Sequence, residues 1–251
     1  MVVIGHKLTS VDHLETRSSP LALMTGSALA DIRSFTSAFA ASGSLAVAIN
    51  FALIPARYFA PQALGIANPG LFDYLPFFSN MFLHGGWLHL ILNMWTLWVF
   101  GPAIEDRLGR GRYLAFYLGC GVLASVTHAA FNPTSLAPAL GVSGAIAGVL
   151  GCYLRLFPYS RVIVLVPILF VPLFFDLYAV VFIGIWIAVQ VLQGVTELVT
   201  PATGEGIAWW AHIGGFAGGL VFGGLLKAPA SRYRAYYGDE GVLGFTPGGM
   251  R

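Results

Sequence analysis

The sequence predicts an all-α, polytopic membrane protein. Of its 251 residues, 57% are hydrophobic and only 10% are charged, and the mean hydropathy is +0.77. Soluble domains carry about 25% charged residues, so this chain has too few to cover a surface that faces water. Its 31 glycines favour closely packed membrane helices. The net charge of +2 gives no indication of nucleic-acid binding.

Six apolar segments are predicted to span the bilayer as helices. In chain order they are residues 35–58, 87–104, 113–131, 143–157, 176–199 and 206–226. The first is the least regular, because its start is small and polar. A further apolar stretch, residues 162–175, is broken by Pro167 and Pro172, so we expect an interfacial connection there rather than a seventh span.

Arginine and lysine indicate which ends of the spans face the cytoplasm. Three arginines lie within residues 107–112, whereas the loop 132–142 has no charged residue. We therefore expect both termini to be cytoplasmic, with a mobile tail at 1–34, a six-helix domain at 35–227 and a second tail at 228–251. The sequence shows no organelle-type presequence, so we expect the bacterial inner membrane.

The loop between the first two spans, residues 59–86, is rich in aromatic side chains and has few polar ones. Aromatic residues at this density favour the membrane interface. Cys120 and Cys152 both fall in apolar segments and are interpreted as small buried hydrophobic residues. We expect no metal site and no cofactor.

Two rare polar side chains in separate spans are predicted to lie at one depth. A helix rises about 1.5 Å per residue. Ser143 lies twelve residues before Arg155, which marks the cytoplasmic end of its span, and so about 18 Å above it. His212 lies fifteen residues before Lys227, about 22 Å above that end.

The second span adds two polar residues to the same layer. Asn93 and His89 lie twelve and sixteen residues before Glu105, about 18 and 24 Å up. A hydrocarbon core is about 30 Å thick, so all four side chains fall near the outer face. A shared site explains this match better than chance does.

The chemistry that fits these residues is acyl transfer. Serine is a weak nucleophile unless a base lies within hydrogen-bonding reach, and His212 is that base for Ser143. No carboxylate falls in the layer, so the sequence predicts a Ser-His dyad. The short fourth span implies that the chain before Ser143 dips into the membrane, which is tolerated where the backbone is packed in protein or lines a wet cavity.

Ser143 also opens its helix, where free backbone amides and the helix dipole favour a developing oxyanion. Asn93 can add a side-chain donor, and His89 lies one turn away on the same face. Each residue also has a structural interpretation: a membrane serine often bonds its own helix, Asn93 could pack between helices, and His212 could bridge two helices. The matching depths favour the catalytic interpretation.

Glycines predict how the serine and the histidine come together. The last span contains two overlapping small-xxx-small frames, Gly214/Gly218 and Gly215/Gly219, and such faces let helix backbones approach closely. Gly144 is the first glycine of a face of small residues on the fourth span, which we expect to lie against the last span. We expect Gly144, Gly215 and Gly219 to form the helix contact at the site.

The sequence resembles the rhomboid intramembrane serine proteases over about residues 45–226. The motifs are His84-x4-His89-x3-Asn93, Glu105-Asp106-Arg107-Leu108-Gly109, Gly141-Val142-Ser143-Gly144, and Ala211-His212-Ile213-Gly214-Gly215 with Gly219.

The resemblance implies a six-helix bundle with Ser143 as nucleophile and His212 as base. It also implies an oxyanion hole formed by His89, Asn93 and the Ser143 amide, a half-submerged first loop, and lateral substrate entry near the fifth span. Two positions depart from the family: Leu75-Pro76 stand where many members have Trp-Arg, and Ala147 stands where some members stack a tyrosine on the histidine.

The leading hypothesis is an intramembrane serine endopeptidase that cleaves transmembrane segments of single-span proteins. Its expected partners are transmembrane substrates and membrane lipid, with no nucleic acid. One alternative is a catalytically silent, rhomboid-like protein that binds or escorts membrane proteins. Another is a small-solute transporter, against which the sequence shows no inverted repeat.

Overall fold

The computed structural model describes residues 2–7, 50–61, 69–168, 171–199 and 208–225. The predicted tail 228–251 and the first predicted span up to residue 49 lie outside these residues.

Five helices form the body of the described chain: α6 (Trp87–Leu108), α7 (Arg110–Phe131), α8 (Ser143–Leu156), α9 (Ala179–Val199) and α10 (Trp209–Leu225). They overlap the five segments predicted as the second to sixth spans, although α6 runs four residues past its predicted end and α7 begins three residues before its predicted start. Among the described residues, three of them, α6, α7 and α9, are long and apolar enough to cross a membrane. Helices α8 and α10 are shorter, with 14 and 17 residues.

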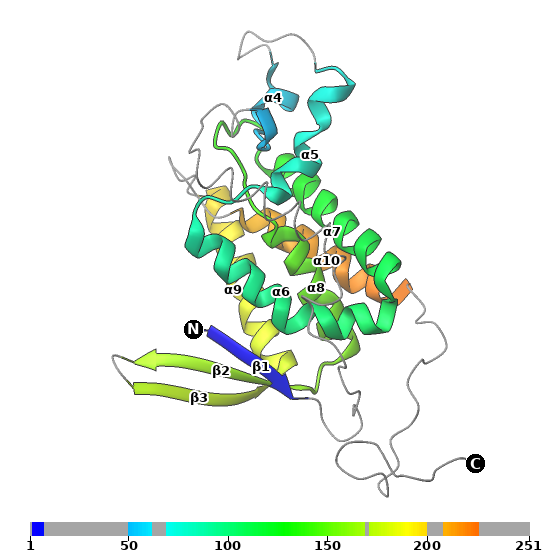
Figure 1. The fold of residues 1–251 in the computed structure, drawn as a ribbon. Helices are drawn as coiled ribbons and strands as arrows, with labels where there is room; N and C mark the ends of the chain where they lie inside the picture. The colour runs from blue at the N-terminus through cyan, green and yellow to red at the C-terminus, as the bar shows by residue number, and fades with distance from the viewer. Residues whose placement is uncertain (1, 8–49, 62–68, 169–170, 200–207, 226–251) are drawn as a thin grey trace, which may run out of the picture.

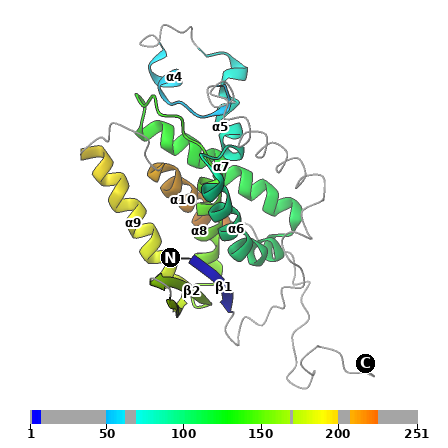
Figure 2. The same ribbon diagram turned by 60° about the vertical axis from the view of Figure 1, so that its left-hand side comes forward.

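Helix α8 lies at the centre of the bundle (Figures 1 and 2). It packs most extensively against α10 and also contacts α6 and α7. A Cβ atom on Gly215 would overlap the carbonyl oxygen of Gly144, and one on Gly219 would overlap that of Gly148. The two helices therefore meet backbone to backbone, which only glycine allows at this distance.

The second glycine frame of α10 faces another helix. Cβ atoms on Gly214 and Gly218 would meet the side chains of Thr127 and Leu123, both on α7. The two frames therefore let α10 fit closely against α8 and α7 at once.

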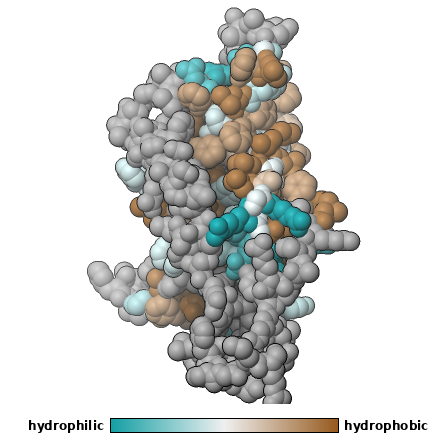
Figure 3. Space-filling model, turned by 45° about the vertical axis from the view of Figure 1, so that its right-hand side comes forward, coloured by the Kyte–Doolittle hydropathy of each residue, from teal (hydrophilic) through white to brown (hydrophobic). Residues whose placement is uncertain are grey.

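The outer faces of the helices expose large apolar side chains. Trp98 on α6, Leu114 on α7 and Ile185 on α9 are 44%, 54% and 58% exposed. Figure 3 shows a continuous hydrophobic surface over the upper part of one side, with a group of hydrophilic residues below it. Such an apolar belt fits hydrocarbon rather than water.

The all-α prediction is wrong at one end of the bundle, where three strands form an antiparallel sheet in the order β1-β2-β3. The strands are β1 (Val2–Lys7), β2 (Arg161–Ile168) and β3 (Val171–Tyr178). The stretch 162–175, expected as an interfacial connection, therefore lies in a β-hairpin formed by β2 and β3. The start of the predicted N-terminal tail is also ordered, because β1 pairs with β2 from Val2↔Leu165 to Lys7↔Arg161.

The prolines in this hairpin exclude a helix but not a sheet. Pro167 and Pro172 face each other near the end of the hairpin. At Pro167, β2 has already passed the last residue that pairs with β1, so the missing N–H there removes no bond on that side. The run from Val162 to Val166 is rich in β-branched residues, which favour strands. Val162 and Val164 alternate inward and are fully buried against the helices.

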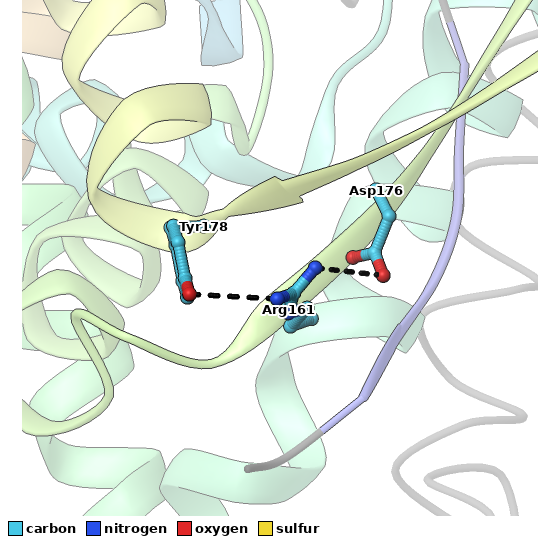
Figure 4. A network of polar contacts seen from close by, with 3 residues as sticks. All are labelled: Arg161, Asp176 and Tyr178. Atoms are coloured by element: carbon cyan, nitrogen blue, oxygen red, sulfur yellow. Dashed lines mark hydrogen bonds and ion pairs between the residues drawn. The ribbon is translucent and has the colours of Figure 1, made fainter.

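The sheet also fixes where α9 begins. The fifth span was predicted from residue 176, but Asp176 belongs to β3 and α9 begins at Ala179. Arg161 on β2 donates to Asp176 at 3.2 Å and to the Tyr178 hydroxyl at 3.4 Å, across the strand pair (Figure 4). These side chains are half-exposed, so the ion pair contributes little, about 0–1 kcal/mol, to stability.

The described end of the first predicted span is not a membrane helix. Leu53 forms an antiparallel bridge with Ala139, and the short helix α4 (Ala56–Phe59) follows, so residues 53–58 do not continue a membrane helix. The aromatic loop then forms three short helices: η2 (Leu71–Tyr74), α5 (Pro76–Ser79) and η3 (Asn80–Phe82). Within it Phe72 is 89% exposed, which suits an interface position.

The glycine contact between α8 and α10 predicts a position-specific effect on stability. Gly219→Ala places a methyl group on the Gly148 carbonyl and forces the helices apart, so we expect it to lower the free energy of unfolding by about 1–3 kcal/mol. The matched control is Gly184→Ala on α9, where a Cβ atom meets nothing within 4 Å. The control should leave thermal melting in detergent unchanged or slightly raised. Equal melting of the two variants would contradict this packing.

Candidate active site

Ser143 is the first residue of α8, as the sequence analysis expected. The chain enters this helix through Gly141, whose backbone φ of +116° is rarely adopted by residues other than glycine. The Gly141 N–H donates to the Asn80 carbonyl at 3.0 Å and fixes the approach to the helix. The first amides of α8 have no acceptor within the helix, so they are available beside the Ser143 hydroxyl.

Ser143 and His212 lie in direct contact. His212 Nε2 lies 2.9 Å from Ser143 Oγ, although 69 residues separate them in the chain. His212 is 9% exposed and Ser143 is half-buried. The Gly215–Gly144 contact lies next to this pair and sets the distance between the two helix backbones.

A third side chain, which the sequence analysis did not single out, contacts the same histidine. Gln190 Oε1 of α9 lies 2.6 Å from His212 Nδ1, and Gln190 is only 6% exposed. The depth calculation could have found this residue. Gln190 lies fourteen residues after Asp176, about 21 Å up, in the same layer as Ser143 and His212. The sequence analysis expected a third partner for the Ser143–His212 pair only among carboxylates, whereas Gln190 is a neutral amide.

Two tryptophan rings lie near the imidazole of His212. The ring centroid of Trp186 on α9 lies 5.8 Å from that of His212, and the centroid of Trp209 on α10 lies 6.5 Å away in an edge-on arrangement. On α8, Ala147 stands at the position where some family members stack a tyrosine on the histidine, so no ring is provided from that helix. The histidine is therefore held largely from α9, through Trp186 and Gln190.

The two residues expected to form the oxyanion hole, His89 and Asn93, are both on α6. The His89 ring lies against Gly141, where a Cβ atom would approach His89 Nε2 to 3.1 Å. Asn93 is 8% exposed, and its buried Nδ2 group has no hydrogen-bond partner among the described residues. A buried donor without a partner is costly, and it is then available to an oxygen that enters the site.

His84 supports His89 from the loop before α6. The two rings meet edge to face with centroids 5.5 Å apart. His84 is buried and neither ring nitrogen has a partner among the described residues. Burial, with a smaller effect of the neighbouring His89, lowers the pKa of His84 to about 4, so this ring is neutral at physiological pH.

A small cavity of about 20 Å³ adjoins Ser143, with room for one water molecule. Its lining includes Asn80 and Ser125, whose side chains are hydrogen-bonded to each other at 2.9 Å. The remaining lining residues are mainly small, among them Gly121, Ala124 and Gly144. Water can therefore be held beside the serine within an otherwise apolar bundle.

The sequence model of the Rhomboid domain family matches residues 72–229, which include every residue of this site. The chain belongs to the rhomboid family. It is therefore a multi-pass membrane protein of a family that includes intramembrane proteases, and its central helices α8 and α10 carry the contact described above.

Curated rhomboid proteins share this similarity. The chain is 26% identical over 165 residues to "Rhomboid protein 1, mitochondrial" of Saccharomyces cerevisiae, covering 62% of this chain and 43% of that protein. It is 34% identical over 91 residues to the "Putative rhomboid protease YdcA" of Bacillus subtilis, covering 36% of this chain and 44% of that protein. It is 43% identical over 72 residues to the "Rhomboid protease GluP" of the same bacterium, covering 29% and 14%. The chain thus spans less than half the length of each of these relatives.

The Ser143–His212 contact predicts an unusually reactive serine. A fluorophosphonate probe should label Ser143 in the detergent-solubilised protein, because His212 Nε2 can accept the hydroxyl proton as Oγ attacks phosphorus. His212→Ala should slow labelling by about 10²- to 10⁴-fold. Thr196→Ala, which removes an exposed hydroxyl bonded within its own helix, is the control and should label like the wild type. Labelling that survives Ser143→Ala would place the reactive group elsewhere.

Proposed function

We propose that this rhomboid-family protein is an intramembrane serine endopeptidase in which Ser143 and His212 form the catalytic dyad. The observation that carries the proposal is the 2.9 Å contact between Ser143 Oγ and His212 Nε2 inside an apolar bundle. A hydroxyl and an imidazole are expensive to keep at that depth unless they serve a function.

The reaction would proceed in two acyl-transfer steps. Ser143 Oγ attacks the scissile carbonyl carbon as its proton passes to His212 Nε2. The carbonyl oxygen becomes an oxyanion, which the Ser143 amide, Asn93 and His89 would stabilise. When the C–N bond breaks, Nε2–H gives its proton to the leaving amine, and an acyl-enzyme remains. Water, activated by the same nitrogen, then releases the acyl group and restores the Ser143 hydroxyl.

The substrates we propose are single-span membrane proteins whose helices unwind near the outer face. A helical peptide hides its amides in its own hydrogen bonds, so the segment must open before Ser143 can reach a carbonyl. We propose a topology of six membrane spans with both termini in the cytoplasm. The first span would lie within residues 35–58 and end before residue 53. The bacterial inner membrane is our predicted location, and the two Bacillus subtilis relatives are compatible with it.

The central test compares wild type with Ser143→Ala on a transmembrane reporter in detergent or liposomes. We expect the wild type to cleave the reporter and Ser143→Ala to lose at least about 10³-fold in rate, because no other group supplies the nucleophile. Folded, membrane-inserted wild type that cleaves no better than Ser143→Ala would favour the silent binding or escort function instead.

Substitution of Asn93 is expected to lower the activity without lowering the stability of the fold. Asn93→Ala removes an oxyanion donor and should lower kcat by about 10²- to 10³-fold. The same change removes a buried donor that has no partner among the described residues, so thermal melting should be unchanged or raised. The measurement pairs reporter kinetics with melting curves. A loss of stability parallel to the loss of activity would show that Asn93 is a packing residue.

A further inference from the structure

We infer that Gln190 is a positioning residue that sets the tautomer and the orientation of the His212 ring. This inference rests on the proposed function, because it assigns a role in the reaction of Ser143 and His212. Gln190 is on α9, a helix that carries none of the other proposed catalytic groups.

The geometry around the imidazole carries the inference. The two ring nitrogens have separate partners, Ser143 Oγ at 2.9 Å from Nε2 and Gln190 Oε1 at 2.6 Å from Nδ1. An amide oxygen only accepts hydrogen bonds, so the Nδ1 that faces it carries the proton. Nε2 then presents a lone pair to the Ser143 hydroxyl, which is the tautomer a general base needs.

The contact also matters during the proton transfer. When Ser143 gives its proton to Nε2, the ring becomes an imidazolium with N–H groups on both sides. The Nδ1–H bond to Gln190 is then charge-assisted and stronger than before. Gln190 itself gains and loses no proton; it holds Nδ1–H in place while Nε2 accepts a proton from Ser143 and passes it to the leaving amine.

A neutral amide suits this position better than a carboxylate. An ionised carboxylate next to a neutral imidazole would be an uncompensated charge in the apolar layer, which is expensive. Gln190 is 6% exposed and supplies an acceptor without that charge. Together with Trp186, it also provides support for the ring from α9, whereas on α8 Ala147 has no ring that could stack on the imidazole.

The test replaces the acceptor while keeping the shape. Gln190→Met has nearly the length of glutamine but no amide oxygen, and Gln190→Glu keeps an oxygen acceptor. The matched control is Gln193→Met, the same exchange three residues along α9 at an exposed position. Each protein is measured for reporter cleavage, fluorophosphonate labelling, thermal melting and the pH dependence of kcat.

We expect Gln190→Met to lower kcat and the labelling rate by about 10- to 100-fold, with a smaller change in KM. Gln190→Glu should recover part of that loss. Because its carboxylate stabilises the imidazolium, it should also move the acid limb of the pH profile by about one unit to higher pH. The other titratable groups that act on the ring are His89 and His128, which no variant changes. Gln193→Met should match the wild type.

Two outcomes would overturn the inference while leaving the proposed function intact. One is cleavage by folded Gln190→Met within twofold of the wild type with the same pH profile. The other, decisive even where Gln190→Met does not fold, is an unchanged pH profile in folded Gln190→Glu. Failure of the proposed function is a different result, since the wild type itself would then neither cleave the reporter nor label at Ser143.

Discussion

The close approach of α8 and α10 is the contact on which the rest of this structure depends. Gly215 and Gly219 lie directly against the backbone carbonyls of Gly144 and Gly148, with no space for a Cβ atom. In lipid there is no hydrophobic drive to bring two helices together, so small residues and van der Waals packing must do it. The same contact brings the start of α8 within hydrogen-bonding distance of α10. The position of Ser143 relative to His212 is therefore a consequence of helix packing.

The membrane also explains why the polar groups of the site are so few and so specifically placed. Each buried polar atom in an apolar bundle needs a partner or raises the free energy of the fold. Beside the cavity, Asn80 donates to the Ser125 hydroxyl, which donates to the Gly121 carbonyl, and His212 has a partner on each ring nitrogen. The Asn93 Nδ2 group and both ring nitrogens of His84 are buried without a partner among the described residues. A donor left in this way remains available to an acceptor that reaches it.

The sheet lies at the start of α9, whereas Gln190, which contacts His212, lies near the middle of this helix. At one end, β3 leads directly into Ala179, and Val162 and Val164 of β2 are buried in the main core with Phe182 and Ile183. After Ile183, Gln190 and Gly194 are the only buried residues of α9. As a whole, α9 is the least buried of the three candidate spans among the described residues. Helix α9 is thus firmly packed at its start and loosely packed near its contact with His212.

The sequence by itself determined the membrane class and the approximate places of the helices from residue 87 onward, because hydropathy is a local property of the chain. The rhomboid motifs indicated the family, and the family match agrees. Only the tertiary structure decided the three-stranded sheet, since its strand β1 lies more than 150 residues from its partner β2 in the chain. It also decided that Gln190 faces His212. A single glutamine in an apolar segment has no local signal for what it contacts, and that contact depends on how α9 is placed against α10.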